Sequence, residues 1–409
     1  MARKAPSDNI ILAFFCLALV SCEANGGVII ARPLPRGAAV VAAETIFNVL
    51  QFGAKPGNGQ STQAFIRAWN AACNFNGKAR LLVPPGVFTL AETVFQGPCK
   101  GPITVQVTGT LKAVADVSEY TGKGWISFDS INGLLLTGGG TFDAQGPSVW
   151  KYNDCKGNSN CVRLPATLYI NDVQNGKLEG IKLLNSMGFH MHVTNCNLFR
   201  AQGLLITAPG DSPNTDGIHI SKSQGVSIVQ SVIGTGDDCI SVGQGSTNVN
   251  ISKIICGPGH GISVGSLGKL PKELDVAEVS VKNCTMLGTT NGVRIKTWAG
   301  SDPSRASRLL FDNIVVDNVQ NPIIIDQGYG SRSSKPSLVK ISDVTYQNIR
   351  GTTTSPVAVN LMCSRQVPCQ NVRLNNINLK HRLNNVKVSA TCANAQVIPS
   401  GIQFPPPCR

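Results

Sequence analysis

Short groups of apolar residues, many of them β-branched, alternate with polar positions along the later part of the chain. Six such groups begin at Val226, Val249, Val279, Leu309, Val339 and Val372, so successive starts lie 23, 30, 30, 30 and 33 residues apart. A second strand-like group follows each of the first five. A period of about 20 to 50 residues is typical of a solenoid, in which each coil buries its apolar face only by stacking on its neighbours.

The short strands, the polar turns and the lack of helical heptads predict an all-β fold, namely a right-handed parallel β-helix. A leucine-rich solenoid is the competing repeat fold, but its LxxLxLxxN pattern is absent from the chain. One short helix is expected before the repeats, over residues 61–73, because Phe65, Ala68, Trp69 and Ala72 recur at helical spacing after a Ser/Thr start. This helix would cap the N-terminal edge of the solenoid, and the proline-rich tail with Cys408 would close the other end.

The N-terminus has the features of a secretory signal peptide. Arg3 and Lys4 precede an apolar stretch at residues 10–20, and small and polar residues follow it. The stretch is well short of the roughly 20 residues that span a bilayer. We therefore expect a signal peptide at residues 1–24 and, since no linker follows, a single domain at residues 25–409. The mature protein should be a secreted monomer in the extracellular space or cell wall, with no membrane attachment after signal cleavage.

Twelve of the 14 cysteines lie after the expected signal peptide. An even number in an exported chain indicates disulfides rather than metal ligands. Proximity in sequence predicts three local disulfides, Cys155–Cys161, Cys363–Cys369 and Cys392–Cys408. Cys239 and Cys256, one coil apart, are expected to form another. Asn250-Ile-Ser and Asn283-Cys-Thr are acceptor motifs for N-glycosylation.

The charge balance favours an anionic partner. The net charge of the chain is +13, and a basic exported protein attracts polyanions by steering and by raising their local concentration. Nucleic acid is one such polyanion, but the chain contains no basic run with interleaved aromatic residues and no zinc-finger spacing. We therefore expect no nucleic-acid partner, and an acidic polysaccharide fits the charge instead.

Chemically active side chains recur at one place in successive coils. Asp216, Asp238 and His260 are 22 residues apart in turn, and each lies just before a second strand. Because adjacent parallel strands lie about 4.8 Å apart, these residues should form one ladder on one face. Strand alternation then predicts two sets of side chains. The inward set is Ile218, Ile220, Ile240, Val242, Ile262, Val264, Val293 and Ile295, and the outward set is His219, Ser241, Ser263, Arg294 and Lys296.

This face would bring together the carboxylates of Asp216, Asp237 and Asp238, an imidazole and two cations. Like charges this close cannot all ionise freely, so at least one carboxyl should have a raised pKa. Glycoside hydrolysis needs such a set: one carboxylic acid protonates the leaving oxygen, and another carboxylate activates water or attacks the sugar directly. Arg294 and Lys296 could bind the carboxylate of an acidic sugar. Taken singly, such residues are most often turn or surface positions, but their coincidence in adjacent coils favours a functional site.

Four segments resemble, in order and spacing, the signature segments of plant polygalacturonases, which form glycoside hydrolase family 28. They are NTD at 214–216, GTGDDC at 234–239, GPGHGISVGSLG at 257–268 and RIK at 294–296. The resemblance covers nearly the whole chain after the signal peptide. It implies a right-handed parallel β-helix that hydrolyses the α-1,4-galacturonosidic bonds of de-esterified pectin, with inversion and without a metal or other cofactor. Within the family the chain is similar to the pollen-type exo-acting group, so exo action is favoured slightly over endo action.

The resemblance also implies a role for each matching residue. Asp237 is expected to be the general acid, and Asp216 and Asp238 would orient and deprotonate the attacking water. His260 would tune the protonation of Asp237. The expected substrate-binding residues are Arg294, Lys296, Asn214 and Tyr329. Gly330 follows Tyr329 where plant relatives usually carry a cysteine, so a supporting disulfide is missing and a less rigid loop is expected there.

Two other functions fit part of the pattern. A pectate lyase is another parallel β-helix, in which clustered aspartates bind Ca²⁺ while a basic residue abstracts a proton. His260 in the ladder and the hydrolase-like segments argue against a lyase. A catalytically silent pectin-binding protein is the second alternative, and it is disfavoured because no expected catalytic position is substituted.

Overall fold

The computed structural model of the chain describes residues 44–57, 59–153, 161, 163–330 and 333–408. The chain divides into two compact units, Met1–Val41 and Ala42–Arg409, and only the second unit is described below. The expected signal peptide, with its boundary at residue 24, lies outside the described residues. Within the described part of the chain, no helix has both the length and the apolar character needed to cross a membrane.

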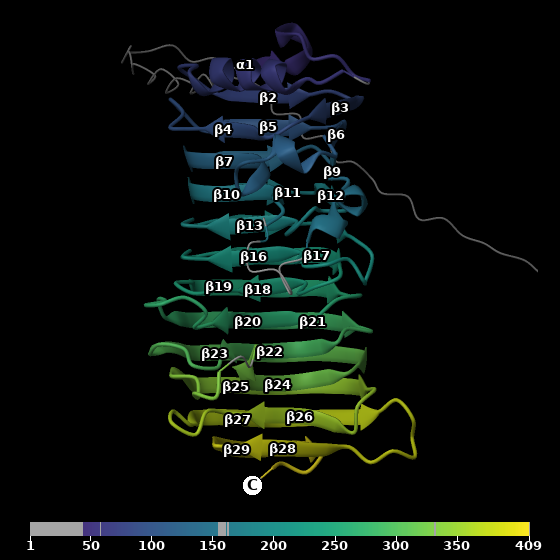
Figure 1. Cartoon of the computed structure of the whole chain (residues 1–409), viewed down its shortest axis with the longest axis vertical. Helices are drawn as coiled ribbons and strands as arrows, with labels where there is room; N and C mark the ends of the chain where they lie inside the picture. The colour runs from purple at the N-terminus through teal and green to yellow at the C-terminus, as the bar shows by residue number, and fades with distance from the viewer. Residues whose placement is uncertain (1–43, 58, 154–160, 162, 331–332, 409) are drawn as a thin grey trace, which may run out of the picture. The chain divides into compact units, whose positions relative to one another are not determined.

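The strands stack coil upon coil in two sheets (Figure 1). Neighbouring strands run parallel throughout, as in the pairs that carry the expected ladder. The sheet with this ladder contains β4 (Thr93–Gln96), β7 (Gly124–Asn132), β10 (Ala166–Gln174), β13 (Met191–Thr194), β16 (Ile218–Ser221), β18 (Ile240–Val242), β20 (Ile262–Leu267), β22 (Asn291–Trp298), β24 (Asn321–Tyr329), β26 (Val357–Met362) and β28 (Ser389–Ala393). The all-β, parallel β-helical fold predicted from the repeat is confirmed.

The second sheet supplies the remaining walls of the coils. Its strand β17 pairs with both β14 and β15, so two short strands of earlier coils continue as one long strand in later coils. The strands are β1 (Thr45–Asn48), β2 (Ala79–Val83), β3 (Val87–Leu90), β5 (Ile103–Val107), β6 (Thr110–Ala113), β8 (Leu134–Thr137), β9 (Thr141–Asp143), β11 (Lys177–Glu179), β12 (Lys182–Leu184), β14 (Arg200–Gln202), β15 (Leu205–Thr207), β17 (Ser227–Gly234), β19 (Thr247–Cys256), β21 (Val276–Leu287), β23 (Ser304–Val319), β25 (Val339–Thr353), β27 (Cys369–His381) and β29 (Ala395–Phe404).

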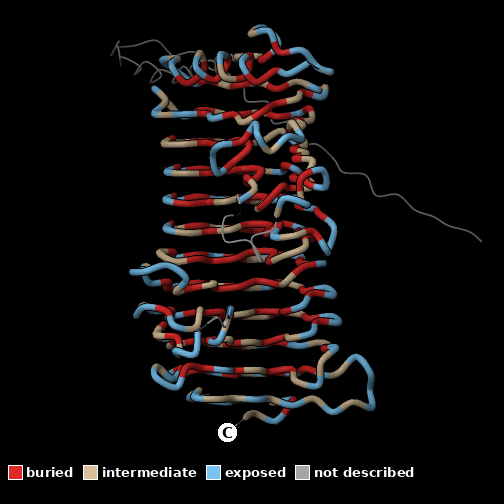
Figure 2. The backbone as a smooth tube through the Cα atoms, viewed as in Figure 1, coloured by how far each residue is buried: buried red, intermediate tan, exposed pale blue. Residues whose placement is uncertain are grey.

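The core runs along the inside of the coils, where buried positions recur from layer to layer as far as β27 (Figure 2). All eight residues of the predicted inward set are 0% exposed. Larger side chains fill the interior beside the long strands, as in the stacked rings of Phe311 and Tyr346, which pair on the neighbouring strands β23 and β25 and have centroids 4.9 Å apart. Stacking of like side chains in successive coils therefore buries apolar surface that a single coil would leave in water.

The predicted helix is present as α1 (Thr62–Cys73) and lies at the N-terminal end of the stack (Figure 1). Its Trp69 is 0% exposed and packs on Phe95 and Phe128, with ring centroids 4.9 Å and 6.0 Å away. The Trp69 Nε1–H donates to the carbonyl oxygen of Gln96 at 3.0 Å. The helix thus covers apolar surface that the first coils would otherwise expose.

Four disulfides join described cysteines: Cys73–Cys99, Cys239–Cys256, Cys363–Cys369 and Cys392–Cys408. The sequence predicts the last three, and Cys392–Cys408 ties the tail beyond β29 to β28. Cys155 lies outside the described residues, so its pairing with Cys161 stays a prediction. Cys196 and Cys284 are free and buried, which the even cysteine count does not reveal. A buried thiol packs as a small apolar group, which suits these interior positions.

Candidate active site

The ladder forms because the strands are in register. Ser241 on β18 pairs with His219 on β16 and with Ser263 on β20, and Ser263 pairs in turn with Arg294 on β22. These side chains leave the coil interior as alternation predicts, yet Ser241 is only 2% and Ser263 0% exposed. The turns that enter the strands carry the aspartates, whose carboxyl groups fold over the two serines. Outward-facing positions are therefore buried here beneath a layer of polar side chains.

Asp238 lies at the centre of the site with both carboxylate oxygens in ion pairs. Arg294 Nη2 is 2.6 Å from Oδ1, and Lys296 Nζ is 2.6 Å from Oδ2. Ser263 Oγ also donates to Oδ1, at 2.9 Å, and accepts from Arg294 Nε at 3.0 Å. Burial has the largest effect and lowers the pKa of Lys296, and the charge of Arg294 lowers it further. The charges of Asp238, Tyr329 and Asp216 together outweigh both, so the net pKa is raised. Lys296 is therefore held charged beside Asp238.

Asp216 is the carboxyl with the raised pKa that the sequence predicts for one member of the cluster. It is 6% exposed, and Ser241 Oγ donates to its Oδ2 at 2.9 Å. Burial raises the pKa of Asp216 well above its ordinary value, and the charges of Asp237 and Asp238 raise it further, against smaller lowering effects of Lys296 and Ser241. The free protein therefore holds a proton on Asp216 more readily than on an ordinary aspartate.

Asp237 and His260 form the more accessible half of the site. His260 Nδ1 lies 3.0 Å from Asp237 Oδ1, and the backbone N–H of Asp238 donates to the same oxygen at 2.7 Å. The side chain of His260 is 38% exposed and that of Asp237 is 25% exposed. Burial acts to raise the pKa of Asp237, but the hydrogen bond and charge of His260, with Lys296, outweigh it and lower the net pKa. Oδ2 of Asp237 makes none of these bonds and is left for a ligand.

Tyr329, whose role in sugar binding stays a prediction, lies beside the two cations. Its ring centroid is 5.9 Å from the guanidinium carbon of Arg294 and 5.2 Å from Lys296 Nζ. The ring of Trp298 meets it edge-on at 5.4 Å, a neighbour that the sequence reasoning did not identify. Asn214 is exposed on the turn before Asp216, with a φ of 54°.

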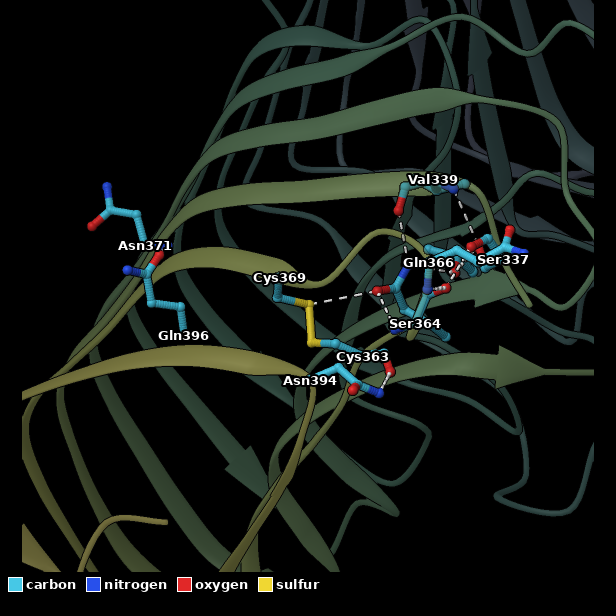
Figure 3. Close-up of a disulfide and its surroundings, with 11 residues drawn as sticks. Ser337, Val339, Cys363, Ser364, Gln366, Cys369, Asn371, Asn394 and Gln396 are labelled. Atoms are coloured by element: carbon cyan, nitrogen blue, oxygen red, sulfur yellow. Dashed lines mark hydrogen bonds between the residues drawn. A yellow bond between two sulfur atoms is a disulfide. The ribbon is translucent and has the colours of Figure 1, made fainter. Parts of the chain in front are cut away.

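The backbone that carries Tyr329 is held more firmly than the missing cysteine suggests. Tyr329 is the last residue of β24 and pairs with Trp298 on β22. Two residues earlier, the buried Gln327 donates from Nε2 to the carbonyl oxygen of Val339 at 2.8 Å and accepts from the Ser364 backbone N–H at 3.0 Å. Figure 3 shows these partners beside the Cys363–Cys369 disulfide. The buried amide of Gln327 and the neighbouring disulfide thus support the strand that carries Tyr329, although the expected cysteine at residue 330 is missing. This holds for the described residues up to 330.

The cluster could be considered as a metal site, since ligand atoms of Asp237, Asp238 and His260 lie within 4.8 Å of one another. Oxygen and imidazole ligands suit several divalent cations. Both oxygens of Asp238, however, already face the positive charges of Arg294 and Lys296 at 2.6 Å. A divalent ion would have to compete with these two cations, so the donor set fits proton transfer better than metal binding.

Comparison with known proteins gives consistent results along the chain. The sequence profile of Glycosyl hydrolases family 28 matches residues 73–401. An exopolygalacturonase of Arabidopsis thaliana is 43% identical, covering 99% of this chain and 98% of the relative. An exopolygalacturonase of Platanus acerifolia is 44% identical over 90% of this chain and 98% of its own length. The crystal structure of a hyperthermoactive exopolygalacturonase from Thermotoga maritima superposes with a TM-score of 0.75 at 19% identity, covering 89% of this chain and 93% of that one.

Proposed function

Because this chain belongs to glycoside hydrolase family 28 and is a polygalacturonase, we propose that it hydrolyses de-esterified galacturonan by inversion, with Asp237 as the general acid. The observation that carries this proposal is the cluster of Asp216, Asp237 and Asp238 beside the partly buried Arg294 and the buried Lys296. It combines an acid, a base and anion-binding groups within one ladder. The carboxyl groups lie on turns of adjacent coils, where a sugar ring can meet more than one of them.

Asp237 is the carboxyl best placed to protonate a leaving oxygen. It is more exposed than Asp216 and Asp238, and only one of its oxygens is held by His260 and the backbone. Its pKa is lowered in the free protein mainly through His260. A galacturonate carboxylate bound nearby would raise that pKa by like-charge repulsion, because it would offset the effects of His260 and Lys296. Substrate binding would thus favour the protonated acid just when it is needed.

Asp216 and Asp238 are the remaining carboxyls and are proposed to orient and deprotonate the attacking water. Asp238 is fixed by Arg294, Lys296 and Ser263, so it provides a steady negative charge. Asp216, with its raised pKa, is a stronger base than an ordinary aspartate once it is ionised.

Arg294 and Lys296 are proposed to bind the carboxylate of the galacturonate unit, with Tyr329 and Asn214 contacting the sugar. A guanidinium has five N–H donors and an ammonium has three, so each keeps donors after binding Asp238. Tyr329 stands over both cations and would shield this pocket from water. A methyl ester would remove the charge that the two cations recognise, which supports a preference for de-esterified substrate.

Secretion and exo action complete the proposal. Residues 1–24 have the pattern of a cleaved signal peptide, and exported family members would meet pectin in the cell wall. The relatives named above are called exopolygalacturonases, which supports release of single units from chain ends. Sequencing the N-terminus of protein recovered from culture medium would test the cleavage site.

The first experiment is incubation of the purified mature protein with polygalacturonic acid, with and without a chelator. Reducing ends, absorbance of unsaturated products and product length are followed together. Hydrolysis predicts reducing ends without unsaturated product and no effect of the chelator, and exo action predicts monomer from the earliest time points. Unsaturated product that disappears with the chelator would mean a lyase, and binding of the polymer without any product would mean a silent binding protein.

A further inference from the structure

Within the described residues, one side chain donates a hydrogen bond to the carboxyl group of Asp216, and it comes from the next coil. Ser241 on β18 donates from Oγ to Asp216 Oδ2 at 2.9 Å. The same Oγ lies 2.7 Å from Nδ1 of His219, which belongs to β16 and is the strand neighbour of Ser241. Three side chains therefore form a continuous chain, from His219 through Ser241 to Asp216, that crosses two coils.

The direction of these hydrogen bonds follows from counting protons. A serine hydroxyl has one proton, and it must point to Asp216 when that carboxyl is ionised. His219 Nδ1 must then carry the proton that it donates to Ser241. Burial lowers the pKa of His219 to about 4, so above that pH the ring is neutral and keeps its proton on Nδ1. Neutral His219 thus orients the hydroxyl without adding a charge.

The histidine is itself held in place by its surroundings. Gly243, in the next coil, has no side chain, and a Cβ there would lie 3.1 Å from Cε1 and 3.2 Å from Nε2 of His219. The rings of Phe189 and His192 also pack against His219, with centroids 5.2 Å and 4.9 Å from its own. A second histidine holds the backbone of Asp216. The backbone N–H of His190 donates to the Asp216 carbonyl oxygen at 2.8 Å, and Nδ1 of the His190 ring lies 3.2 Å from the same oxygen.

We propose that Ser241, oriented by His219, is a positioning residue that aims the Asp216 carboxylate at the attacking water. This inference rests on the proposed function, in which Asp216 acts on water. It assigns a task to two residues of the outward set whose hydrogen bonds, within the described residues, do not involve the two cations or Asp237. The carboxylate of Asp238 relies less on its serine. Without Ser263 it would still have Arg294 and Lys296 as partners.

The test compares serine-to-alanine variants at three buried positions. Within the described part of the chain, Ser241→Ala removes the one side-chain hydrogen bond that the Asp216 carboxyl accepts, and Ser263→Ala removes one of the three that Asp238 accepts. Ser246→Ala is the matched control. Ser246 is 0% exposed and its Oγ has no partner within the described residues. We expect kcat on polygalacturonic acid to fall roughly 10- to 100-fold in Ser241→Ala, several-fold in Ser263→Ala and little in Ser246→Ala, with KM nearly unchanged in all three.

A pH profile separates positioning from general damage to the fold. The groups that face Asp216 are Asp237, Asp238, Lys296 and Ser241, and the Ser241 hydrogen bond lowers the pKa of Asp216. Its loss should therefore move the acidic limb of the Ser241→Ala profile to higher pH, while the Ser246→Ala profile stays in place. His219 is tested by two amides: Asn can place its N–H where Nδ1 stands, whereas Gln reaches the place of Nε2. His219→Asn should retain most activity and His219→Gln should lose it.

The outcomes distinguish this inference from the proposed function. If the wild type hydrolyses the polymer but Ser241→Ala matches Ser246→Ala in kcat and in pH profile, the positioning role is overturned. It is equally overturned if His219→Gln and His219→Asn are alike in activity while both remain folded by circular dichroism. If the wild type yields unsaturated product instead, the proposed function fails first, and the serine comparison no longer bears on water activation.

Discussion

At the scale of single residues, the three carboxyl groups share one small volume but have different surroundings. Asp238 has two ion pairs, Asp216 has burial and like charges, and Asp237 has His260. The sequence predicts that one carboxyl has a raised pKa but does not say which, because all three lie at similar turn positions. The choice depends on which carboxyl is nearest to Arg294 and Lys296, and these residues come from β22, more than 50 positions further along the chain.

Replacement of Asp237 by Asn tests the general acid. The amide keeps the shape of the side chain and can still lie beside His260, but it cannot give a proton to a leaving oxygen. We expect kcat to fall by about 10²- to 10⁴-fold, while the affinity for oligogalacturonate, measured by calorimetry, changes little. Asp317→Asn, at an exposed carboxyl of β23 in the other sheet, is the matched control. Equal turnover in Asp237→Asn and wild type would remove Asp237 from the acid role.

Replacement of Asp216 by Asn tests its raised pKa through stability. The folded protein binds a proton on Asp216 more tightly than the unfolded chain, whose aspartates titrate near pH 3.9. Stability from this group is complete below about pH 3.9 and is lost as pH rises through the folded pKa. Since Asn cannot ionise, Asp216→Asn should exceed wild type in free energy of unfolding by more than about 1 kcal/mol at pH 7, and the two should converge near about pH 4.

Urea unfolding at the two pH values measures this difference. Asp317→Asn should show no comparable divergence from wild type, because its carboxyl is exposed. An Asp216→Asn protein that is less stable than wild type at pH 7 would mean that the ionised carboxylate stabilises the fold, contrary to the burial and like charges around it.

At the scale of elements, strand alternation is the feature that the sequence predicts best. The period-two pattern assigns all eight inward residues correctly, because an apolar side chain at each of these positions has nowhere else to be buried. The same pattern does not reveal that Ser241, Ser263 and Lys296 are buried as well. Their burial comes from turns of neighbouring coils and from mutual hydrogen bonds, which no local pattern records. The sequence does not predict that Gln327 supports the strand of Tyr329, for the same reason. The hydrogen-bond partners of Gln327 lie 12 and 37 residues away in the sequence.

The helix α1 provides a test of capping at this scale. Trp69 is fully buried against Phe95 and Phe128 and donates a hydrogen bond to Gln96. Trp69→Ala should lower the free energy of unfolding by about 3–5 kcal/mol, whereas Trp69→Phe, which keeps a ring in the gap, should cost less. Urea titration followed by circular dichroism measures both. Similar losses in the two variants would show that the hydrogen bond to Gln96, rather than the buried ring, fixes the helix on the first coil.

At the scale of the whole described unit, the stack explains how the site can contain so many buried charges. Each coil is supported mainly by its two neighbours. The site occupies coils in the middle, from β16 to β24, and coils with buried residues lie on both sides of it (Figure 2). The cost of burying charges in these coils is offset by packing in the coils around them. Residues separated by 80 positions in sequence, such as Asp216 and Lys296, thereby share one site.

The charge of the chain leads to a prediction that depends on no single residue. With a net charge of +13, the protein should attract polygalacturonate over distances comparable to the Debye length, which falls from about 30 Å at 0.01 M to about 10 Å at 0.1 M ionic strength. We expect kcat/KM for polygalacturonic acid to fall about 10-fold between these ionic strengths, mainly through KM. Highly methylated pectin is the control, because it lacks most of the charge. An equal fall on both substrates would mean that salt acts on the protein itself rather than on the encounter. A larger fall on the de-esterified polymer would show that long-range attraction adds to the short-range recognition proposed for Arg294 and Lys296.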